Sequence, residues 1–191
     1  MTKIGIVIST TRDARFADKP AAWLLALAQA RGDFEYELVD LRDHPLPFFY
    51  EAASSMATPS EDPEGQRWER RVAEFDGFIF VTAEYNHGPS AAMKNALDYA
   101  YPAWNRKPVA FFGYGGVGAA RAVEQLRLVA SALEMMTVPF GVHLQGGDFM
   151  AAWKGGKPLE DFPQLVPAAN RMLDQLAWWV RTLNAGRYAP V

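Results

Sequence analysis

The sequence contains no cysteine, which excludes disulfides, thiolate metal sites and cysteine redox chemistry. It has no basic excess either, because 19 Lys and Arg against 22 Asp and Glu give a net charge of −3. The clustered basic face that nucleic acid requires is therefore not expected. No apolar run approaches the roughly twenty residues of a membrane span, and the short run Ile4–Ile8 predicts a strand rather than a signal peptide. We expect a soluble, cytoplasmic protein that binds neither nucleic acid nor membrane.

The chain has 191 residues, about half of them hydrophobic, which predicts one globular domain over residues 1–191. Short apolar runs predict strands at 4–8, 36–39, 78–81, 109–112 and 138–142. The run 36–39 alternates polar and apolar residues, which suggests a sheet edge. Helical patterns fall at 21–31, 64–75, 91–101, 119–136 and 163–183. This alternation predicts an α/β fold with a parallel sheet covered by helices on both faces. Residues 46–63 are rich in Pro, Ser and Ala and predict one long irregular loop.

In open α/β sheets, ligands bind at the C-terminal ends of the strands, and three loops leave such ends here. The first loop, residues 9–16, places Ser9, Thr10, Thr11, Arg12 and Arg15 before a helix. Hydroxyls, guanidiniums and free N–H groups at a helix N-terminus are suited to a phosphate. The alternative is that Ser and Thr cap the helix while the arginines are solvated, and the loop alone leaves both interpretations open.

The second loop, residues 82–90, carries Tyr85, Asn86, His87, Gly88 and Pro89. Such a turn presents an aromatic ring, an amide and exposed backbone, which suit a planar heteroaromatic ligand. The alternative is an ordinary turn with Pro89 opening a helix. His87 alone gives no reason to assign a catalytic role.

The third loop, Gly113-Tyr114-Gly115-Gly116-Val117-Gly118, has the letters of a dinucleotide-binding motif. We reject that interpretation, because the motif follows the fourth strand and Glu134, about twenty residues on, lies within a helical pattern. Glycines that allow close approach of the backbone to a flat ligand, with Tyr114 packed against it, explain the loop better.

Two further groups have structural explanations. Lys94 and Asp98 are spaced for an i,i+4 ion pair. The tryptophans are expected in the core or at subunit contacts, and Trp104 with its neighbours Tyr99, Tyr101 and Pro102 predicts an interface patch.

Together and in this order, the three loops resemble the NADPH-dependent FMN reductase family over nearly the whole chain. Ser9, Arg12 and Arg15 fall where that family holds the FMN phosphate, although Ile8-Ser9 stands where the family has Gly-Ser. The turn Thr82-Ala83-Glu84-Tyr85-Asn86 matches a family turn but lacks its proline. The resemblance continues through Lys94-Asn95-Ala96-Leu97-Asp98 and Tyr114-Gly115-Gly116. The predicted cofactor-binding residues are Ser9, Thr11, Arg12, Arg15, Phe16, Thr82, Glu84, Tyr85, Asn86, Tyr114, Gly115 and Gly116.

The resemblance implies a flavodoxin-like fold with strand order 2-1-3-4-5, non-covalent FMN, and homodimers or homotetramers. It implies that NADPH or NADH reduces the flavin, which passes electrons to a quinone, flavin or similar small acceptor. The flavin carries this chemistry, so no general acid or base is assigned, and backbone N–H groups near Glu84, Tyr85 and Asn86 would stabilise its reduced ring. Two alternatives stay open. One is a flavodoxin-like electron carrier, although such carriers are usually strongly acidic. The other is a non-redox α/β protein that binds a phosphorylated metabolite.

Overall fold

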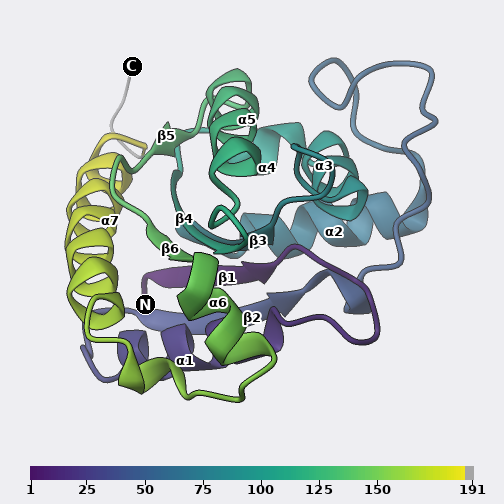
Figure 1. Cartoon of the computed structure of the whole chain (residues 1–191). Coiled ribbons are helices and arrows are strands. Elements are labelled where there is room, and N and C mark those ends of the chain that lie inside the picture. The colour runs from purple at the N-terminus through teal and green to yellow at the C-terminus, as the bar shows by residue number, and fades with distance from the viewer. Residues whose placement is uncertain (188–191) are drawn as a thin grey trace.

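The computed structural model describes residues 1–187, and the last four residues of the predicted domain lie outside that range (Figure 1). Its sheet consists of β1 (Lys3–Ile8), β2 (Glu35–Asp40), β3 (Gly77–Ala83), β4 (Pro108–Gly115), β5 (Met136–Thr137) and β6 (Val142–Gln145). All pairings are parallel, in the order β2-β1-β3-β4-β5, and β6 also pairs with β4. The predicted α/β class and the flavodoxin-like order 2-1-3-4-5 are confirmed, and β2 lies at the predicted edge.

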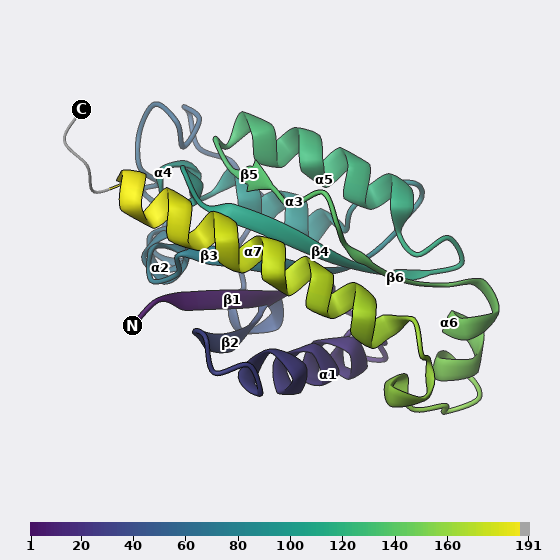
Figure 2. The same ribbon diagram turned by 90° about the vertical axis from the view of Figure 1, so that its left-hand side faces the viewer.

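Helices cover both faces of the sheet (Figure 2). On one face lie α1 (Asp18–Gln29) and α7 (Leu165–Arg187), and on the other lie α2 (Pro63–Ala73), α3 (Ala91–Asp98), α4 (Tyr101–Trp104) and α5 (Ala120–Ala132). Side chains of β1 alternate between the two layers, since Ile4, Ile6 and Ile8 pack toward α1 and α7 whereas Val7 packs toward the opposite helices. Burial on both faces explains why the central strands are apolar without alternation.

The fifth strand differs from its prediction. Residues 138–142 were expected to form one strand, but β5 ends at Thr137 and β6 begins at Val142. Pro139 lies between them and has no N–H group to donate to a ladder. Two short strands therefore share the position beside β4, one at each end of it.

The predicted helix from 91 to 101 is also divided, since α3 ends at Asp98 and α4 starts at Tyr101, beside Pro102. The predicted helix from 119 to 136 ends at Ala132. The expected interface patch is wrong for Tyr99 and Trp104, which are fully buried in the core beneath α3 and α4. The Lys94–Asp98 ion pair is present, with Nζ 2.8 Å from both carboxylate oxygens.

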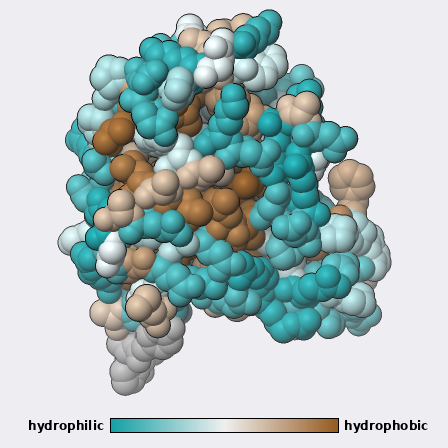
Figure 3. Space-filling view, turned by 90° about the horizontal axis from the view of Figure 1, so that it is seen from below, coloured by the Kyte–Doolittle hydropathy of each residue, from teal (hydrophilic) through white to brown (hydrophobic). Residues whose placement is uncertain are grey.

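The surface of the molecule has two notable features. The long loop predicted at 46–63 is present and leads from η1 (Leu41–Asp43) to α2, which begins at Pro63. On the face seen from below, which carries α1 and α6 (Gly146–Trp153), apolar residues gather near the middle and are ringed by hydrophilic ones (Figure 3). Within residues 1–187, every helix is too short or too polar to span a bilayer.

Candidate functional site

The three predicted loops meet at the C-terminal ends of β1, β3 and β4, where they line a cavity of about 250 Å³. Arg12, Ala14, Arg15 and Phe16 come from the first loop, Ala83, Glu84 and Tyr85 from the second, and Tyr114 and Gly115 from the third. This convergence follows from the topology, because neighbouring parallel strands end at the same edge of a sheet. A larger cavity of about 550 Å³ lies on the other side of the first loop, lined by Thr11, Arg42 and the start of the 46–63 loop among others.

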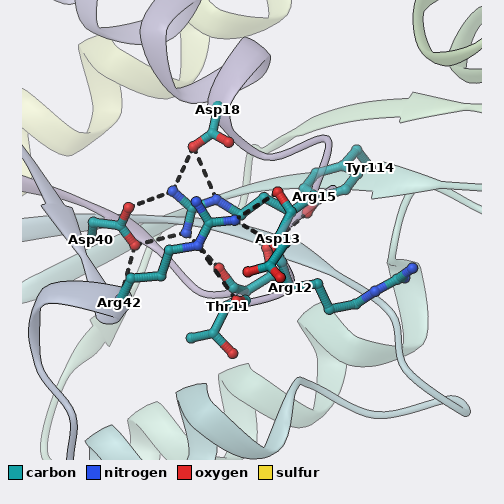
Figure 4. Close-up of polar contacts among 9 residues, drawn as sticks. Thr11, Arg12, Asp13, Arg15, Asp18, Asp40, Arg42 and Tyr114 are labelled. Carbon is teal, nitrogen blue, oxygen red and sulfur yellow. Dashed lines mark hydrogen bonds and ion pairs between the residues drawn. The ribbon is translucent and has the colours of Figure 1, made fainter.

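Two arginines hold the backbone of the first loop. Arg15 Nη1 donates to the carbonyl oxygen of Thr10 at 2.6 Å. Arg42, from η1, donates to the carbonyl oxygens of Thr11, Arg12 and Asp13 (Figure 4). Four successive carbonyl groups, those of residues 10–13, are thereby directed toward two guanidinium groups.

This arrangement fixes the direction of the next four N–H groups. In a planar trans peptide, the N–H group points away from the carbonyl oxygen of the same unit. The N–H groups of Thr11, Arg12, Asp13 and Ala14 therefore point away from the two guanidiniums. Within residues 1–187, no protein group accepts a hydrogen bond from any of these four. Successive unpartnered N–H groups form a concave site that favours an anion.

Arg15 is not available to a ligand in this arrangement. A guanidinium has five N–H donors, and those of Arg15 bond to Thr10 O, to both carboxylate oxygens of Asp40 and twice to Asp18. Its side chain is only 3% exposed. Hydrogen bonding to Asp40 raises the pKa of Arg15 further, so the guanidinium stays charged. Burial alone would raise the pKa of Asp40, but the hydrogen bonds from Arg15 outweigh this and lower it.

Arg12 behaves differently from Arg15. It is exposed and lines the cavity, and its side chain extends away from the Arg15–Asp40–Asp18 cluster (Figure 4). Within the described residues, its guanidinium forms no ion pair and donates no hydrogen bond to the protein. Arg12 therefore leaves a cationic group free beside the unpartnered N–H groups.

The second loop is a tight turn held by its own backbone. Tyr85 N donates to Gly88 O at 2.8 Å and Gly88 N donates to Tyr85 O at 3.1 Å. Asn86 and His87 between them have φ of 51° and 71°, as in a type I′ turn. A positive φ is uncommon for residues other than glycine, and backbone of this kind often accompanies a functional site. The turn is held further by Gln125, whose Nε2 donates to His87 O at 2.8 Å.

Glu84 connects this turn to α5. Its carboxylate accepts a hydrogen bond from Arg121 Nε at 2.6 Å and one from Arg121 N at 3.1 Å, so that it caps the start of the helix. The side-chain hydrogen bond from Arg121 lowers the pKa of Glu84. Because its charge is satisfied there, Glu84 places no free negative charge in the cavity.

The third loop begins inside the strand, because Gly113, Tyr114 and Gly115 are the last residues of β4. A Cβ atom at Gly113 would lie 2.1 Å from Gly118 O, so only glycine allows the loop to fold back here. Gly115 has φ of 137°, which other residues rarely adopt, and both Gly115 and Gly116 border open space. Tyr114 is 5% exposed, its hydroxyl lies 3.3 Å from Thr10 Oγ1, and burial raises its pKa to about 12. Tyr114 thus joins the third loop to the first.

The sequence analysis missed α6, the helix that forms the remaining wall of the cavity. Phe149 and Trp153 line the cavity from this helix, and Phe149 packs against Phe16 with ring centroids 5.4 Å apart. The sequence did contain a signal, since two aromatic residues at i,i+4 spacing lie between the pairs Gly146-Gly147 and Gly155-Gly156.

Five predicted site residues do not line this cavity. Ser9 and Thr82 are fully buried, and the Thr82 hydroxyl donates to Ala83 O. Thr11 faces the larger cavity. Asn86 is exposed on the turn, and Gly116 accepts a hydrogen bond from Gly146 N. Among them, the buried Ser9 Oγ has no hydrogen-bond partner in the described structure, although Ser9 O accepts from Ser90.

Comparisons with known proteins agree with this geometry. The model of the NADPH-dependent FMN reductase family matches residues 2–147. The chain belongs to this family. An NAD(P)H-dependent FMN reductase of Schizosaccharomyces pombe is 35% identical over 139 residues, which cover 72% of this chain and 70% of that protein. A 2-hydroxy-1,4-benzoquinone reductase of a Burkholderia species is 33% identical over 189 residues, which cover 94% of this chain and 96% of that protein.

A solved structure shows the same fold. The flavoenzyme NAD(P)H:(acceptor) oxidoreductase FerB of Paracoccus denitrificans superposes with a TM-score of 0.73 at 21% identity, covering 95% of this chain and 98% of that one. The family predicted from the three loops is confirmed, and with it the class of FMN-dependent NAD(P)H oxidoreductase.

The residues at the strand ends fit FMN. The free N–H groups of the first loop and the Arg12 guanidinium suit a phosphate, and the buried Ser9 Oγ lacks a partner at the start of the same loop. The open backbone at Gly115 and Gly116 allows close approach of a flat ring system. A volume of about 250 Å³ would enclose only part of FMN, so the rest would lie at the open mouth of the cavity.

Proposed function

We propose that the three loops hold FMN at the ends of β1, β3 and β4, and that the protein uses it to oxidise NADPH or NADH. The observation that carries this proposal is the first loop, in which four N–H groups without protein acceptors lie beside an unpaired arginine. An anion is the ligand that such a loop favours, and membership of the FMN reductase family supports the FMN phosphate as that anion.

In this proposal the phosphate contacts come from Arg12 and the loop backbone, with the unpartnered Ser9 as a hydroxyl donor. Arg12 supplies the cationic charge. Arg15, predicted from the sequence as a phosphate ligand, has a positioning role instead, because all five of its donors are engaged by Thr10, Asp18 and Asp40. Arg42 has the same role through the carbonyl groups of Thr11, Arg12 and Asp13.

The isoalloxazine ring is proposed to lie between the second and third loops. Gly115 and Gly116 offer backbone without side chains, and Tyr85 and Asn86 offer a ring and an amide on the opposite turn. Tyr114 and Phe16, whose ring centroids are 5.4 Å apart, form the inner wall of the cavity. Thr82 supports the end of β3 from within the sheet.

The chain's own residues position the reactants and stabilise charge. Bound FMN supplies the redox chemistry, because it takes two electrons from a nicotinamide and releases them to an acceptor. Backbone N–H groups of the second loop and the positive end of the α5 dipole would stabilise negative charge on the ring. Glu84 contributes by fixing the turn to α5 through Arg121. The acceptor is proposed to be a quinone, a flavin or a similar small molecule.

We also propose that the protein is a homodimer or homotetramer. Exposed apolar side chains gather on the 46–63 loop at Phe48, Tyr50 and Met56, and Leu128 of α5 is 74% exposed. A mainly apolar cavity of about 410 Å³ lies between that loop and α5. Association of two copies through this surface would remove these side chains from water. Sedimentation equilibrium of the wild type against a Met56→Glu, Leu128→Glu double variant tests this, and a monomeric wild type contradicts it.

A steady-state assay tests the activity. The FMN-loaded protein is mixed with NADPH or NADH and a quinone, and nicotinamide oxidation is followed by absorbance. The proposal predicts repeated turnover that depends on both the nicotinamide and the quinone. An FMN-loaded protein that shows no turnover with either nicotinamide would instead be an electron carrier.

A further inference from the structure

Phe149 and Trp153 form an aromatic wall that runs from the core to the rim of the cavity. Their rings are stacked, with centroids 5.5 Å apart and planes 17° apart. Phe149 packs inward against Phe16, with ring planes at 85°, whereas Trp153 is 49% exposed. The wall therefore ends at the mouth of the cavity in a half-exposed indole ring, and Lys154 Nζ lies 5.4 Å from the centroid of that ring on a flexible side chain.

The wall is held beside the third loop. Gly146 N, at the start of α6, donates to Gly116 O at 3.1 Å. Asp148, two residues on, accepts from Gln164 Nε2 at 2.6 Å, which ties the helix to the segment before α7. The aromatic wall thus lies next to the glycines where the flavin ring is proposed to sit.

Exposure of Trp153 is not explained by the family resemblance or by the core. Phe149 and Trp153 lie beyond residues 2–147, which the family model matches. Trp178 on α7 is also exposed, at 58%, so exposure alone does not indicate a ligand. Trp153 is distinguished because it lines the cavity at the strand ends and continues an aromatic stack that begins in the core.

We propose that Phe149 and Trp153 form a stacking site for a planar aromatic electron acceptor of the quinone class, beside the bound flavin. The face of an indole ring is electron-rich and a quinone ring is electron-poor, so the two attract each other when stacked. This inference rests on the proposed function. The overall reaction is balanced, since one NAD(P)H, one proton and one quinone give one NAD(P)⁺ and one hydroquinone.

The kinetic test compares two acceptors on the FMN-loaded protein. 1,4-Naphthoquinone has a flat two-ring system, whereas ferricyanide takes electrons one at a time and has no ring to stack. In Trp153→Ala, kcat/KM for naphthoquinone is expected to fall about tenfold, the effect of one lost stacking contact, and kcat/KM for ferricyanide is expected to stay unchanged. Trp153→Phe should keep most of the naphthoquinone activity, and Trp178→Ala should keep both activities.

A binding measurement separates acceptor binding from flavin binding. 1,4-Naphthoquinone is not reduced while the bound FMN is oxidised and no nicotinamide is present, so its Kd for the FMN-loaded protein can be measured by calorimetry. We expect Trp153→Ala to raise this Kd about tenfold without changing the Kd for FMN. An unchanged Kd for 1,4-naphthoquinone would overturn the inference. A raised Kd for FMN with equal loss of both acceptors would also overturn it, because Trp153 would then bind the flavin.

The outcomes distinguish this inference from the proposed function. A wild-type protein that retains no FMN would overturn the proposed function, and the stacking site with it. A wild-type protein that retains FMN and turns over, combined with a Trp153→Ala variant that reduces naphthoquinone normally, would overturn only the stacking site.

Discussion

Arg15 and Asp40 form a two-pronged ion pair that joins the first loop to the last residue of β2. One of the two hydrogen bonds, from Arg15 Nη1 to Asp40 Oδ1, is 2.7 Å long, and the same nitrogen donates to Thr10 O. The carboxylate of a neighbouring strand therefore sets the direction of the loop carbonyls, and through them the direction of the N–H groups proposed to hold the FMN phosphate.

This pair predicts that Asp40→Asn loosens the first loop. Removing the charge leaves the nearly buried Arg15 with Asp18 alone as counter-ion, at a cost of about 2 kcal/mol in the free energy of unfolding. The affinity for FMN should fall although no proposed phosphate ligand is changed. Urea unfolding and FMN titration measure the two effects. As a control, Asp98→Asn removes an exposed i,i+4 ion pair and should change neither the free energy of unfolding nor the affinity for FMN by much. Normal FMN affinity in Asp40→Asn would contradict the positioning role.

The same pair predicts how acid affects the protein. Because the folded pKa of Asp40 is lowered, its stabilising contribution is present above the ordinary carboxyl pKa of about 4 and is lost as the pH falls through the folded value. Unfolding of the wild type and of Asp40→Asn, measured from pH 6 down to pH 3, should converge at the acid end. A constant difference between them would contradict this account.

Arg12 is predicted to recognise the phosphate rather than the ring. Arg12→Ala should raise the Kd for FMN by about ten- to a hundredfold, since it removes charge-assisted hydrogen bonds. The Kd for riboflavin, which lacks the phosphate, should change little. Fluorescence titration with both flavins measures the two constants, and the exposed Arg70 of α2 provides a matched Arg→Ala control. Equal loss of affinity for FMN and riboflavin would contradict phosphate recognition by Arg12.

Gly115 and Gly116 provide a matched pair of alanine variants. Gly115→Ala forces a side chain onto φ of 137° and should destabilise the fold by about 1–3 kcal/mol. The φ of Gly116 is not in the positive range, and a Cβ atom there meets nothing within 4 Å. Gly116→Ala should therefore leave the fold intact. Its methyl group would project into the space proposed for the flavin, so the affinity for FMN should fall. Unchanged FMN affinity in a stable Gly116→Ala protein would contradict the proposed position of the ring.

The fold and the meeting of the three loops could be predicted, whereas the roles of single residues could not. Strand order places the ends of β1, β3 and β4 together whatever the loop side chains do, and Tyr114, Gly115, Glu84 and Tyr85 line the cavity there. A guanidinium is different, because its partners depend on neighbours that are distant in sequence. Nothing local indicates that Arg15 binds Asp40, 25 residues away, and leaves Arg12 free.

Two structural differences have local causes that the sequence pattern did not reveal. Apolar periodicity at residues 138–142 predicts a strand, but Pro139 removes a ladder donor and divides it. The helix α6 begins with Gly146-Gly147 and is followed by Gly155-Gly156, pairs that are typical of a loop, so the helix was missed together with Phe149 and Trp153.

Lys107, which lies far from the site, is expected to make the free energy of unfolding depend on pH. It is 6% exposed near the start of β4, its Nζ donates to Val72 O at 3.0 Å, and burial lowers its pKa to about 8. Between pH 8 and its ordinary value of 10.5, the unfolded chain holds a proton that the folded chain has released, so stability rises with pH. Relative to Lys107→Met, the wild type should gain about 2 kcal/mol between pH 7.5 and pH 9.5. Parallel pH profiles of the two proteins in urea unfolding would contradict this.

The central claim is that the three loops bind FMN and that a nicotinamide reduces it there. The most direct test is the absorption spectrum of the purified protein after addition of FMN and desalting, recorded before and after NADPH under anaerobic conditions. The account predicts flavin bands that survive desalting and bleach when NADPH is added. Flavin bands that persist unbleached with both NADPH and NADH, or the absence of retained flavin, would contradict it.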